Sequence, residues 1–269
     1  MRLQNWGRLR TLALLFVLVA SLYMTTYSAN IESGDARRLF DTVSSVVDHG
    51  DLLLDLSAWQ FPPQNFDPTN PLPLQSGNIE PLQIVAAVPL YLLAKVTPLG
   101  LVQTVYLLNV IVGALAACIL YGYAITLGYR ERTAILTAIL FAACTLMWVY
   151  SKSFFREPLM LLMMLTAALI IERLRLKGYR SIPLLIALVV TLIAAILTKA
   201  SAAMGFPALL ILALPNVRGV SWRRVIFGGG LILALIVAVF VGLAIYGAAA
   251  GLGGRYNVCL LYTSPSPRD

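Results

Sequence analysis

The chain has 269 residues, of which 59% are hydrophobic and only 12% are charged. Soluble domains are roughly 45–50% apolar and about 25% charged, so this composition excludes an ordinary soluble protein. The formal charge of +8 does not indicate nucleic-acid binding, because Lys and Arg occur in short loops between long apolar runs, as in the cytoplasmic loops of membrane proteins. We therefore predict an integral membrane protein that binds no nucleic acid.

The first predicted element is an apolar run, Thr11–Tyr27, that follows three arginines. Basic residues before a first span place the N-terminus in the cytoplasm. The candidate cleavage site Tyr27-Ser28-Ala29 carries a bulky tyrosine where a signal peptide needs a small residue. We expect an uncleaved spanning helix.

A polar stretch, Ala29–Gly77, follows and contains seven Asp or Glu residues. Within it, Asp35–Val47 repeats apolar residues such as Leu39 and Val43 at helical spacing, which predicts an amphipathic helix at a membrane surface or on the protein. Prolines between residues 62 and 73 forbid regular helix and indicate a loop.

Six further apolar runs each approach the roughly 20 residues that a spanning helix needs. They are Leu101–Leu127, Thr133–Tyr150, Pro158–Leu176, Ile182–Thr198, Ala200–Leu214 and Val225–Ala248. A shorter run, Pro81–Val96, contains Pro89 and Lys95 and is ambiguous.

Charge counting decides whether the ambiguous run spans. If Pro81–Val96 lies on the surface, twelve basic residues fall inside and seven outside, leaving Arg268 aside. If it spans, every later loop changes side and most basic residues fall outside, against the positive-inside rule. We predict an all-α polytopic membrane protein with about seven transmembrane helices and residues 29–100 as one large extracytoplasmic loop. This topology puts Asp35 and Glu157 in the same compartment.

Glu32 and Asp35 are the first candidate site residues, directly after the first span. Ser33 is placed to cap a surface helix, and a carboxylate in the first helical turn is favoured by the helix dipole. Alternatively, a carboxylate at the outer face acts as a general base or holds a divalent metal. The residues alone leave both interpretations open.

A second group of charges, Lys152, Arg156 and Glu157, lies in a very short loop, and Lys199 stands alone between two apolar runs. Charges at a membrane face are costly unless they pair or meet a ligand. Arg and Lys suit a phosphate, although both also extend to lipid headgroups without any site. Glu157 precedes a proline, an ordinary helix-start position.

The arrangement resembles the membrane glycosyltransferases of the GT-C fold, such as protein O-mannosyltransferases and aminoarabinose transferases. Three segments carry the resemblance: Ser33–Arg38 with the later Gly50-Asp51-Leu52, Pro81-Leu82 opening a surface helix, and Trp148 through Pro158. The similarity covers residues 8 to about 215 and is stronger in architecture than in motif.

The resemblance implies an inverting transfer at the extracytoplasmic face, from a polyprenyl-phosphate-linked sugar to a hydroxyl of an acceptor glycan, lipid or protein. Asp35 would be the general base, Glu157 a second acidic residue and Glu32 a possible acidic partner. The donor phosphate would be held by Lys152, Arg156 or Lys199. A divalent metal is an optional cofactor, and no other is expected. We expect a multi-pass protein in the plasma membrane of a prokaryote.

The last eleven residues, 259–269, resemble the in-frame translation of a transposon sequencing adapter. The expected module is therefore residues 1–258, a fragment of a longer enzyme and inactive by itself. A native Pro/Ser-rich tail is the alternative.

Two other classes of function remain. A transporter or lipid flippase would place ionisable groups near the middle of the bilayer, whereas here the acidic residues crowd one outer loop. A non-catalytic membrane scaffold would not need the charges at 152–157.

Overall fold

The computed structural model describes residues 2–31, 33–54, 74–75 and 81–214, with Gly230, Ala238, Val241 and Gly242. Most of these residues are helical, which confirms the predicted helical class. The strands among them are two antiparallel ones of two residues each, β1 (Leu53–Leu54) and β2 (Leu74–Gln75).

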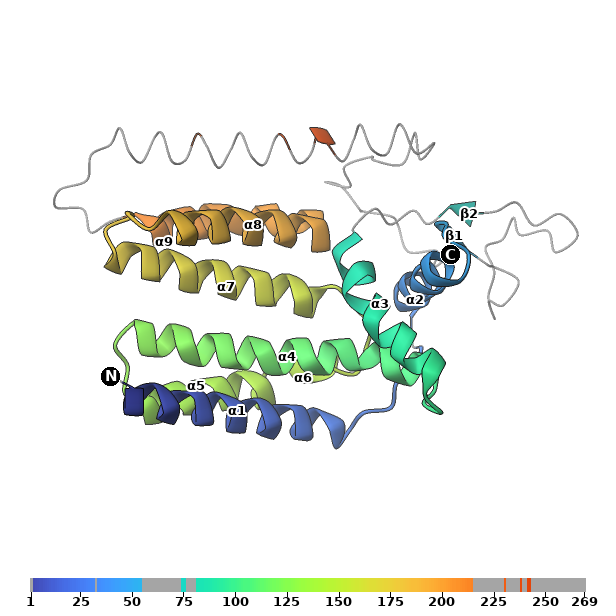
Figure 1. Cartoon of the computed structure of the whole chain (residues 1–269), viewed down its shortest axis with the longest axis horizontal. Helices are drawn as coiled ribbons and strands as arrows, with labels where there is room; N and C mark the ends of the chain where they lie inside the picture. The colour runs from blue at the N-terminus through green and yellow to red at the C-terminus, as the bar shows by residue number, and fades with distance from the viewer. Residues whose placement is uncertain are drawn as a thin grey trace, which may run out of the picture.

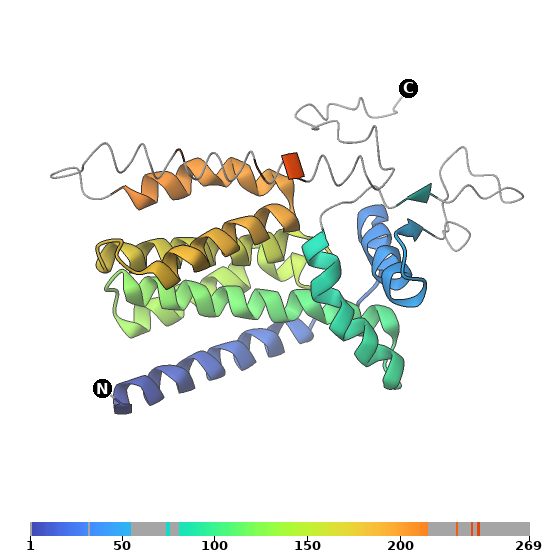
Figure 2. The same cartoon turned by 45° about the horizontal axis from the view of Figure 1, so that its top comes forward.

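The helices form a bundle with two further helices across one end (Figures 1 and 2). The bundle comprises α1 (Arg2–Met24), α4 (Leu101–Thr126), α5 (Glu131–Cys144), α6 (Leu146–Tyr150), α7 (Glu157–Leu176), α8 (Ile182–Thr198), the 3₁₀ helix η2 (Ala200–Gly205) and α9 (Phe206–Ala213). The end helices are α2 (Gly34–Asp48) and α3 (Pro81–Val96), which lie far from the N-terminus.

Helix α4 forms the centre of the bundle and packs against α1, α3, α5 and α7. Small residues allow these close approaches, since Ala114, Ala116 and Ala117 are fully buried. At Gly113 an added Cβ would lie 2.7 Å from the Tyr23 ring and 2.8 Å from the Met147 methyl group. Glycine is therefore the residue that lets α1 and α6 reach α4.

The predicted continuous run Thr133–Tyr150 is divided into α5 and α6 at Thr145. This residue is extended (φ −122°, ψ 175°), and its Oγ1 accepts a hydrogen bond from the Met147 amide at 3.2 Å. A threonine side chain can compete with the helical backbone for such bonds. Hydrophobic run length carries no signal of that competition, so the sequence prediction missed the break.

Two described helical segments are long and apolar enough to cross a membrane, Gly7–Met24 and Leu101–Thr126. Three apolar helical segments are shorter: Pro81–Val96, Ile182–Thr198 and Ala200–Ala213. Most of the predicted span Val225–Ala248, and all of residues 259–269, lie outside the described residues. Two such segments are weak support for membrane association, and the predicted seven-span topology goes beyond this finding.

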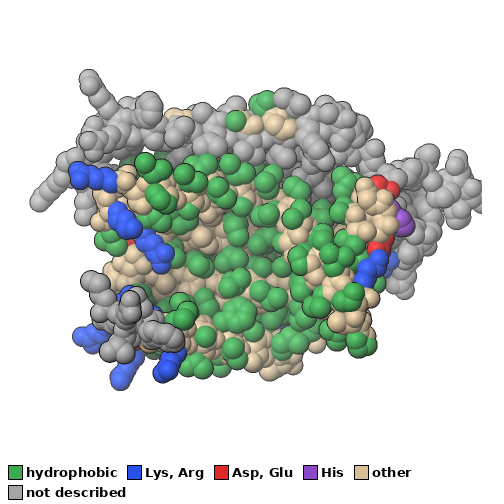
Figure 3. All heavy atoms as spheres, in the orientation of Figure 1, with side chains coloured by type: hydrophobic (Ala, Val, Ile, Leu, Met, Phe, Trp, Pro, Cys, Tyr) green, Lys and Arg blue, Asp and Glu red, His purple; other side chains and the backbone are tan. Residues whose placement is uncertain are grey.

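The bundle has an apolar lateral surface between two polar ends. Large apolar side chains are exposed on it, with Leu14 of α1 at 71% and Leu136 of α5 at 60%. Figure 3 shows hydrophobic side chains covering the middle of one face, with Lys and Arg gathered at the left end, where the N-terminus lies in Figure 1. A lateral apolar band of this kind is typical of helices that face lipid.

Helix α2 is amphipathic, as predicted. Leu39 and Val43 are fully buried in one core cluster with α3 residues Ile84 and Ala87. Helix α3 in turn packs on α4 and on α8. These contacts bring the segment after the first helix to the same end of the bundle as the start of α7.

Candidate functional site

The turn between α6 and α7, residues 151–156, is held by hydrogen bonds from two buried side-chain amides. Asn109 of α4 donates from Nδ2 to the carbonyls of Ser153 at 2.6 Å and Phe155 at 2.8 Å. Gln83 of α3 donates from Nε2 to the same Phe155 carbonyl at 3.4 Å and to Asn109 Oδ1 at 3.4 Å. Both side chains are fully buried. Their bonds hold the backbone that carries Arg156 and Glu157.

An aromatic contact fixes the same turn. Phe154 is fully buried and stacks on Tyr106 of α4, with ring centroids 5.4 Å apart. Stacked aromatic rings add to the stabilisation that their burial provides. The turn therefore has a packed, defined conformation rather than that of a surface loop.

Glu157 is the first residue of α7, and Pro158 follows it in the first turn. Its Oε1 accepts a hydrogen bond from Lys199 Nζ, in an ion pair that joins α7 to the junction between α8 and η2. Both side chains are less than one-third exposed. Two residues 42 positions apart in sequence are thus paired at the end of the bundle.

The pKa of Glu157 is lowered from its ordinary value. Burial alone would raise this pKa, but the Lys199 hydrogen bond, the Glu157 backbone N–H, and the charges of Lys199 and Arg156 together outweigh it. The position at a helix N-terminus also favours the anion. Glu157 is therefore a carboxylate at neutral pH and a hydrogen-bond acceptor.

Arg156 connects this pair with α2. Burial lowers the pKa of Arg156, the charges of Glu157 and Asp35 raise it, and the nearby Arg38 lowers it. Leu39 of α2 and Leu159 of α7 belong to one buried cluster. The two helices therefore lie at the same end of the bundle, and the shared site stays a prediction.

Asp35 lies in the first turn of α2 and is exposed. The capping role predicted for Ser33 is confirmed, because Ser33 Oγ accepts from the Ala36 amide at 3.1 Å. The cap belongs to Ser33, so the exposed Asp35 is not needed for it.

Two candidates from the sequence are left, and the structure describes one of them. Glu32 lies outside the described residues. Lys152 is half-buried on the turn after α6, and within the described part of the chain it makes no ion pair with Glu157 or Asp35. The cluster formed by Asp35, Arg38, Arg156, Glu157 and Lys199 is called the α2–α7 site below.

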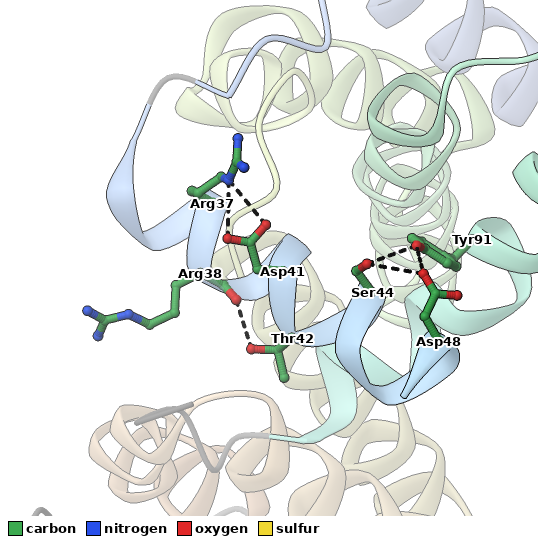
Figure 4. A network of polar contacts seen from close by, with 7 residues as sticks. All are labelled: Arg37, Arg38, Asp41, Thr42, Ser44, Asp48 and Tyr91. Atoms are coloured by element: carbon green, nitrogen blue, oxygen red, sulfur yellow. Dashed lines mark hydrogen bonds and ion pairs between the residues drawn. The ribbon is translucent and has the colours of Figure 1, made fainter. Parts of the chain in front are cut away.

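A second polar network joins the C-terminal parts of α2 and α3 (Figure 4). Tyr91 Oη donates to Asp48 Oδ2 at 2.6 Å and lies 2.9 Å from Ser44 Oγ, and Lys95 forms an ion pair with Asp48. The hydrogen bond from Lys95 is the largest cause of a lowered Asp48 pKa. In Figure 4 the Arg38 side chain extends away from Asp41 and from this network.

Sequence reasoning missed Gln83, Asn109 and Arg38. A polar residue within the apolar runs Pro81–Val96 and Leu101–Leu127 was the available signal for the first two, since polar groups inside such helices usually have a partner. Arg38 stands beside Arg37 in sequence, and Arg37 pairs with Asp41 at 3.1 Å. The two arginines are adjacent in sequence and differ in the direction in which the helix points their side chains.

The arrangement is suited to binding an anion. Lys199 and Arg156 act on the ionised carboxylate of Glu157, and Asp35 and Arg38 act on Arg156. Three basic side chains thus meet two acidic ones, so positive charge exceeds negative charge. Among the described residues, no group of three Asp, Glu, His or Cys side chains is placed to hold a metal ion. A divalent cation would also be repelled by the three neighbouring basic groups.

Comparisons with known proteins add no family to this description. No protein-family model matches the sequence, and no curated protein matches it. A function for this chain is therefore inferred from the geometry of the α2–α7 site and from the pattern of the sequence.

Proposed function

We propose that the protein is an integral membrane glycosyltransferase that moves a sugar from a polyprenyl-phosphate donor to an acceptor hydroxyl at the extracytoplasmic face. The observation that carries this proposal is the excess of basic side chains around Glu157, beside the exposed carboxylate of Asp35. These side chains lie at the end of an apolar bundle, where the membrane surface would be. A phosphate-bearing lipid has its charge at the same level.

The proposed topology has seven spans, a cytoplasmic N-terminus and residues 29–100 outside. Exposed basic residues at the end of the bundle that holds the N-terminus support this orientation, since Lys and Arg are enriched in cytoplasmic loops. These residues are Arg8, Arg10, Arg130, Arg132, Arg173, Lys177 and Arg180. The α2–α7 site lies at the opposite end and would face the outer compartment.

In the proposed reaction, Arg156 and Lys199 hold the donor phosphate. Lys199 has three N–H donors and uses one on Glu157, which leaves two for phosphate oxygens. The acceptor hydroxyl attacks the anomeric carbon, the bond from that carbon to the phosphate oxygen breaks, and polyprenyl phosphate leaves. Asp35 takes the proton of the attacking hydroxyl.

Glu157 has a different role in this scheme. Its pairing with Lys199 and the positive charge of Arg156 lower its pKa, which makes it a weaker base than an ordinary carboxylate. It orients Lys199 and keeps that ammonium group at the end of α7. Asp35, which makes no ion pair among the described residues, is the better-placed base.

The test measures binding of a short-chain polyprenyl-phosphate hexose, labelled in the sugar, to the purified chain in detergent, because this fragment is expected to be inactive by itself. We expect saturable binding that Arg156→Gln weakens and that Asp35→Asn leaves nearly unchanged. Arg132→Gln, at the opposite end of the bundle, is the matched control for loss of one arginine. Equal binding by the parent chain and Arg156→Gln would overturn the proposal.

A further inference from the structure

Gln83 presents a buried acceptor beside the turn that carries the site. Its side chain is fully buried, and its Nε2 is directed at Asn109 Oδ1 and the Phe155 carbonyl. Its Oε1 has no hydrogen-bond partner within the described part of the chain. Buried polar atoms without a partner are rare in native proteins and need an explanation.

Glu157 presents a second such acceptor two residues after Phe155. Its Oε1 is bound to Lys199, whereas its buried Oε2 has no partner among the residues that the structure describes. Because the carboxylate is ionised, Oε2 accepts hydrogen bonds and cannot donate one. Two donor-seeking oxygens therefore flank the same short segment, residues 155–157.

A buried donor completes the set. Arg38 Nε is buried and, over the described ranges, has no acceptor. Its charge acts on Arg156, so it belongs to the same side of the site. A ligand that satisfies all three atoms must carry an acceptor, for which an anionic oxygen suits a guanidinium best, and neighbouring hydrogen-bond donors.

A bare phosphate ion does not meet this requirement well, because it offers several acceptors and few donors. A sugar attached to phosphate does meet it, since its ring hydroxyls donate to acceptors while the phosphate accepts from arginine. A divalent cation would suit the two oxygens alone, but three basic side chains stand beside them and oppose it.

We propose that Gln83 and Glu157 form a sugar-hydroxyl subsite, in which Gln83 Oε1 and Glu157 Oε2 each accept a hydrogen bond from a ring hydroxyl of the donor sugar. The subsite rests on the proposed function and adds to it: the hexose, and not only its phosphate, is recognised. It predicts that a site built to bond hydroxyls discriminates strongly against a ring that lacks them.

The test compares soluble probes that differ only in hydroxyl groups. Binding of the 1-phosphates of glucose, galactose and mannose, of cyclohexyl phosphate and of inorganic phosphate is measured calorimetrically with the purified chain. Cyclohexyl phosphate has a six-membered ring and a phosphate but no ring hydroxyls. We expect at least one hexose 1-phosphate to bind about tenfold or more tightly than cyclohexyl phosphate, the factor that one or two hydrogen bonds to a charged or buried acceptor supply.

Two variants separate recognition from support of the turn. Gln83→Met keeps the volume of the side chain and removes its acceptor, and should bring the ratio of the two affinities close to one. Phe154→Ala loosens the same turn by removing the stacking on Tyr106 but takes away no hydrogen-bond partner of Gln83, and should weaken both probes while keeping their ratio. Thermal unfolding of each variant checks that it is folded.

The inference is overturned if hexose 1-phosphates and cyclohexyl phosphate bind the parent chain equally, or if none of the probes binds. It is also overturned if Gln83→Met weakens both probes by the same factor, because that result means structural support alone. The proposed function is judged separately: failure of the polyprenyl-phosphate hexose to bind, with the affinity ratio of the soluble probes intact, would refute the lipid donor and leave the subsite.

Discussion

Each end of α7 carries a glutamate, and the two are held in different ways. Glu172, near the C-terminal end, is the more buried, with 10% of its side chain exposed, and pairs with Arg175 on its own helix at 2.7 Å. Glu157, at the N-terminal end, is 30% exposed and pairs with Lys199 from another segment. Glu172 is therefore neutralised within its own helix, whereas Glu157 is neutralised by a residue that only the tertiary structure brings near.

The local pair has a simple structural explanation. Residues three apart on a helix are neighbours, so Arg175 offsets a carboxylate that the helix dipole disfavours near a C-terminus. The long-range pair has more around it: Arg156, Arg38 and Asp35 lie nearby, and Glu157 Oε2 has no partner among the described residues. Surplus positive charge and an unsatisfied oxygen distinguish a candidate ligand site from a stabilising contact.

The largest expected effect concerns which side of the membrane each end of α7 faces. In the proposed topology, Glu157 and Glu172 face opposite compartments. Single cysteines at Gly34, Ser153 and Lys177 are placed in a chain whose native cysteines are replaced. Gly34 is exposed, and a Cβ there meets nothing within 4 Å. We expect an impermeant thiol reagent to label positions 34 and 153 in sealed cells, and position 177 only in inverted vesicles.

Labelling of positions 34 and 153 from opposite sides would contradict the proposed seven-span topology. In that case Pro81–Val96 would cross the membrane, Asp35 and Glu157 could not share a site, and the transporter interpretation would be favoured.

The next effect separates the two ion pairs by function. Lys199→Met removes a proposed phosphate donor, so we expect the affinity for a polyprenyl-phosphate hexose to fall about 10- to 100-fold, the range for a lost hydrogen bond to a charged group. Arg175→Gln removes the cation of the local pair and should leave that affinity unchanged. Equal losses in both variants would mean that Lys199 acts through stability, which a thermal unfolding curve of each variant would show.

A smaller effect tests how the turn before α7 is held. Asn109→Ala leaves the carbonyls of Ser153 and Phe155 without their amide donor, so we expect the free energy of unfolding to fall by about 1–3 kcal/mol. Thr137→Ala removes an exposed hydroxyl bonded within α5 at 2.9 Å and should cost about 0.5 kcal/mol or less. Denaturant unfolding in detergent measures both. A cost for Asn109→Ala no greater than that of the control would show that other contacts fix the turn.

The smallest effect concerns the α2–α3 network and its pH dependence. The pKa of Asp48 is lowered by its bonds to Lys95 and Tyr91, so the folded state favours the carboxylate. Its contribution to stability is therefore complete above the ordinary value of about 4 and is lost as pH falls through the lower pKa of the folded state. We expect Asp48→Asn to have a slightly lower melting temperature at pH 7 and to match the parent at low pH. A constant difference at all pH values would contradict this assignment.

Much of the helical layout follows from local sequence. Spacing and residue type predicted the cap at Ser33 and the amphipathic helix after it. They also predicted a helix with the bounds Pro81–Val96. The break at Thr145 was not predicted, because it depends on one side chain bonding its own backbone within an otherwise apolar run. Periodicity reports which face is apolar and gives no information on a single competing hydrogen bond.

The candidate site was predictable in its residue types and incomplete in its membership. Charged residues in an apolar chain are few, which made Asp35, Arg156, Glu157 and Lys199 visible from sequence. The prediction for Lys152 stays a prediction, since nothing in the described residues joins it to the others. Gln83 and Asn109 went unnoticed because a neutral polar residue in an apolar helix shows its partner only once the helices are packed.

The sequence by itself determined that this chain is helical and apolar, where its surface helices begin, and which residues carry charge, because these properties depend on neighbours within one helical turn or on simple composition. Tertiary structure alone decided that Glu157 pairs with Lys199, that Arg38 acts on Arg156, and that Gln83 keeps an acceptor beside the same turn. Such pairings depend on the direction of side chains from four separate segments, and that direction is set by how α3, α4 and α8 pack, which no local pattern encodes.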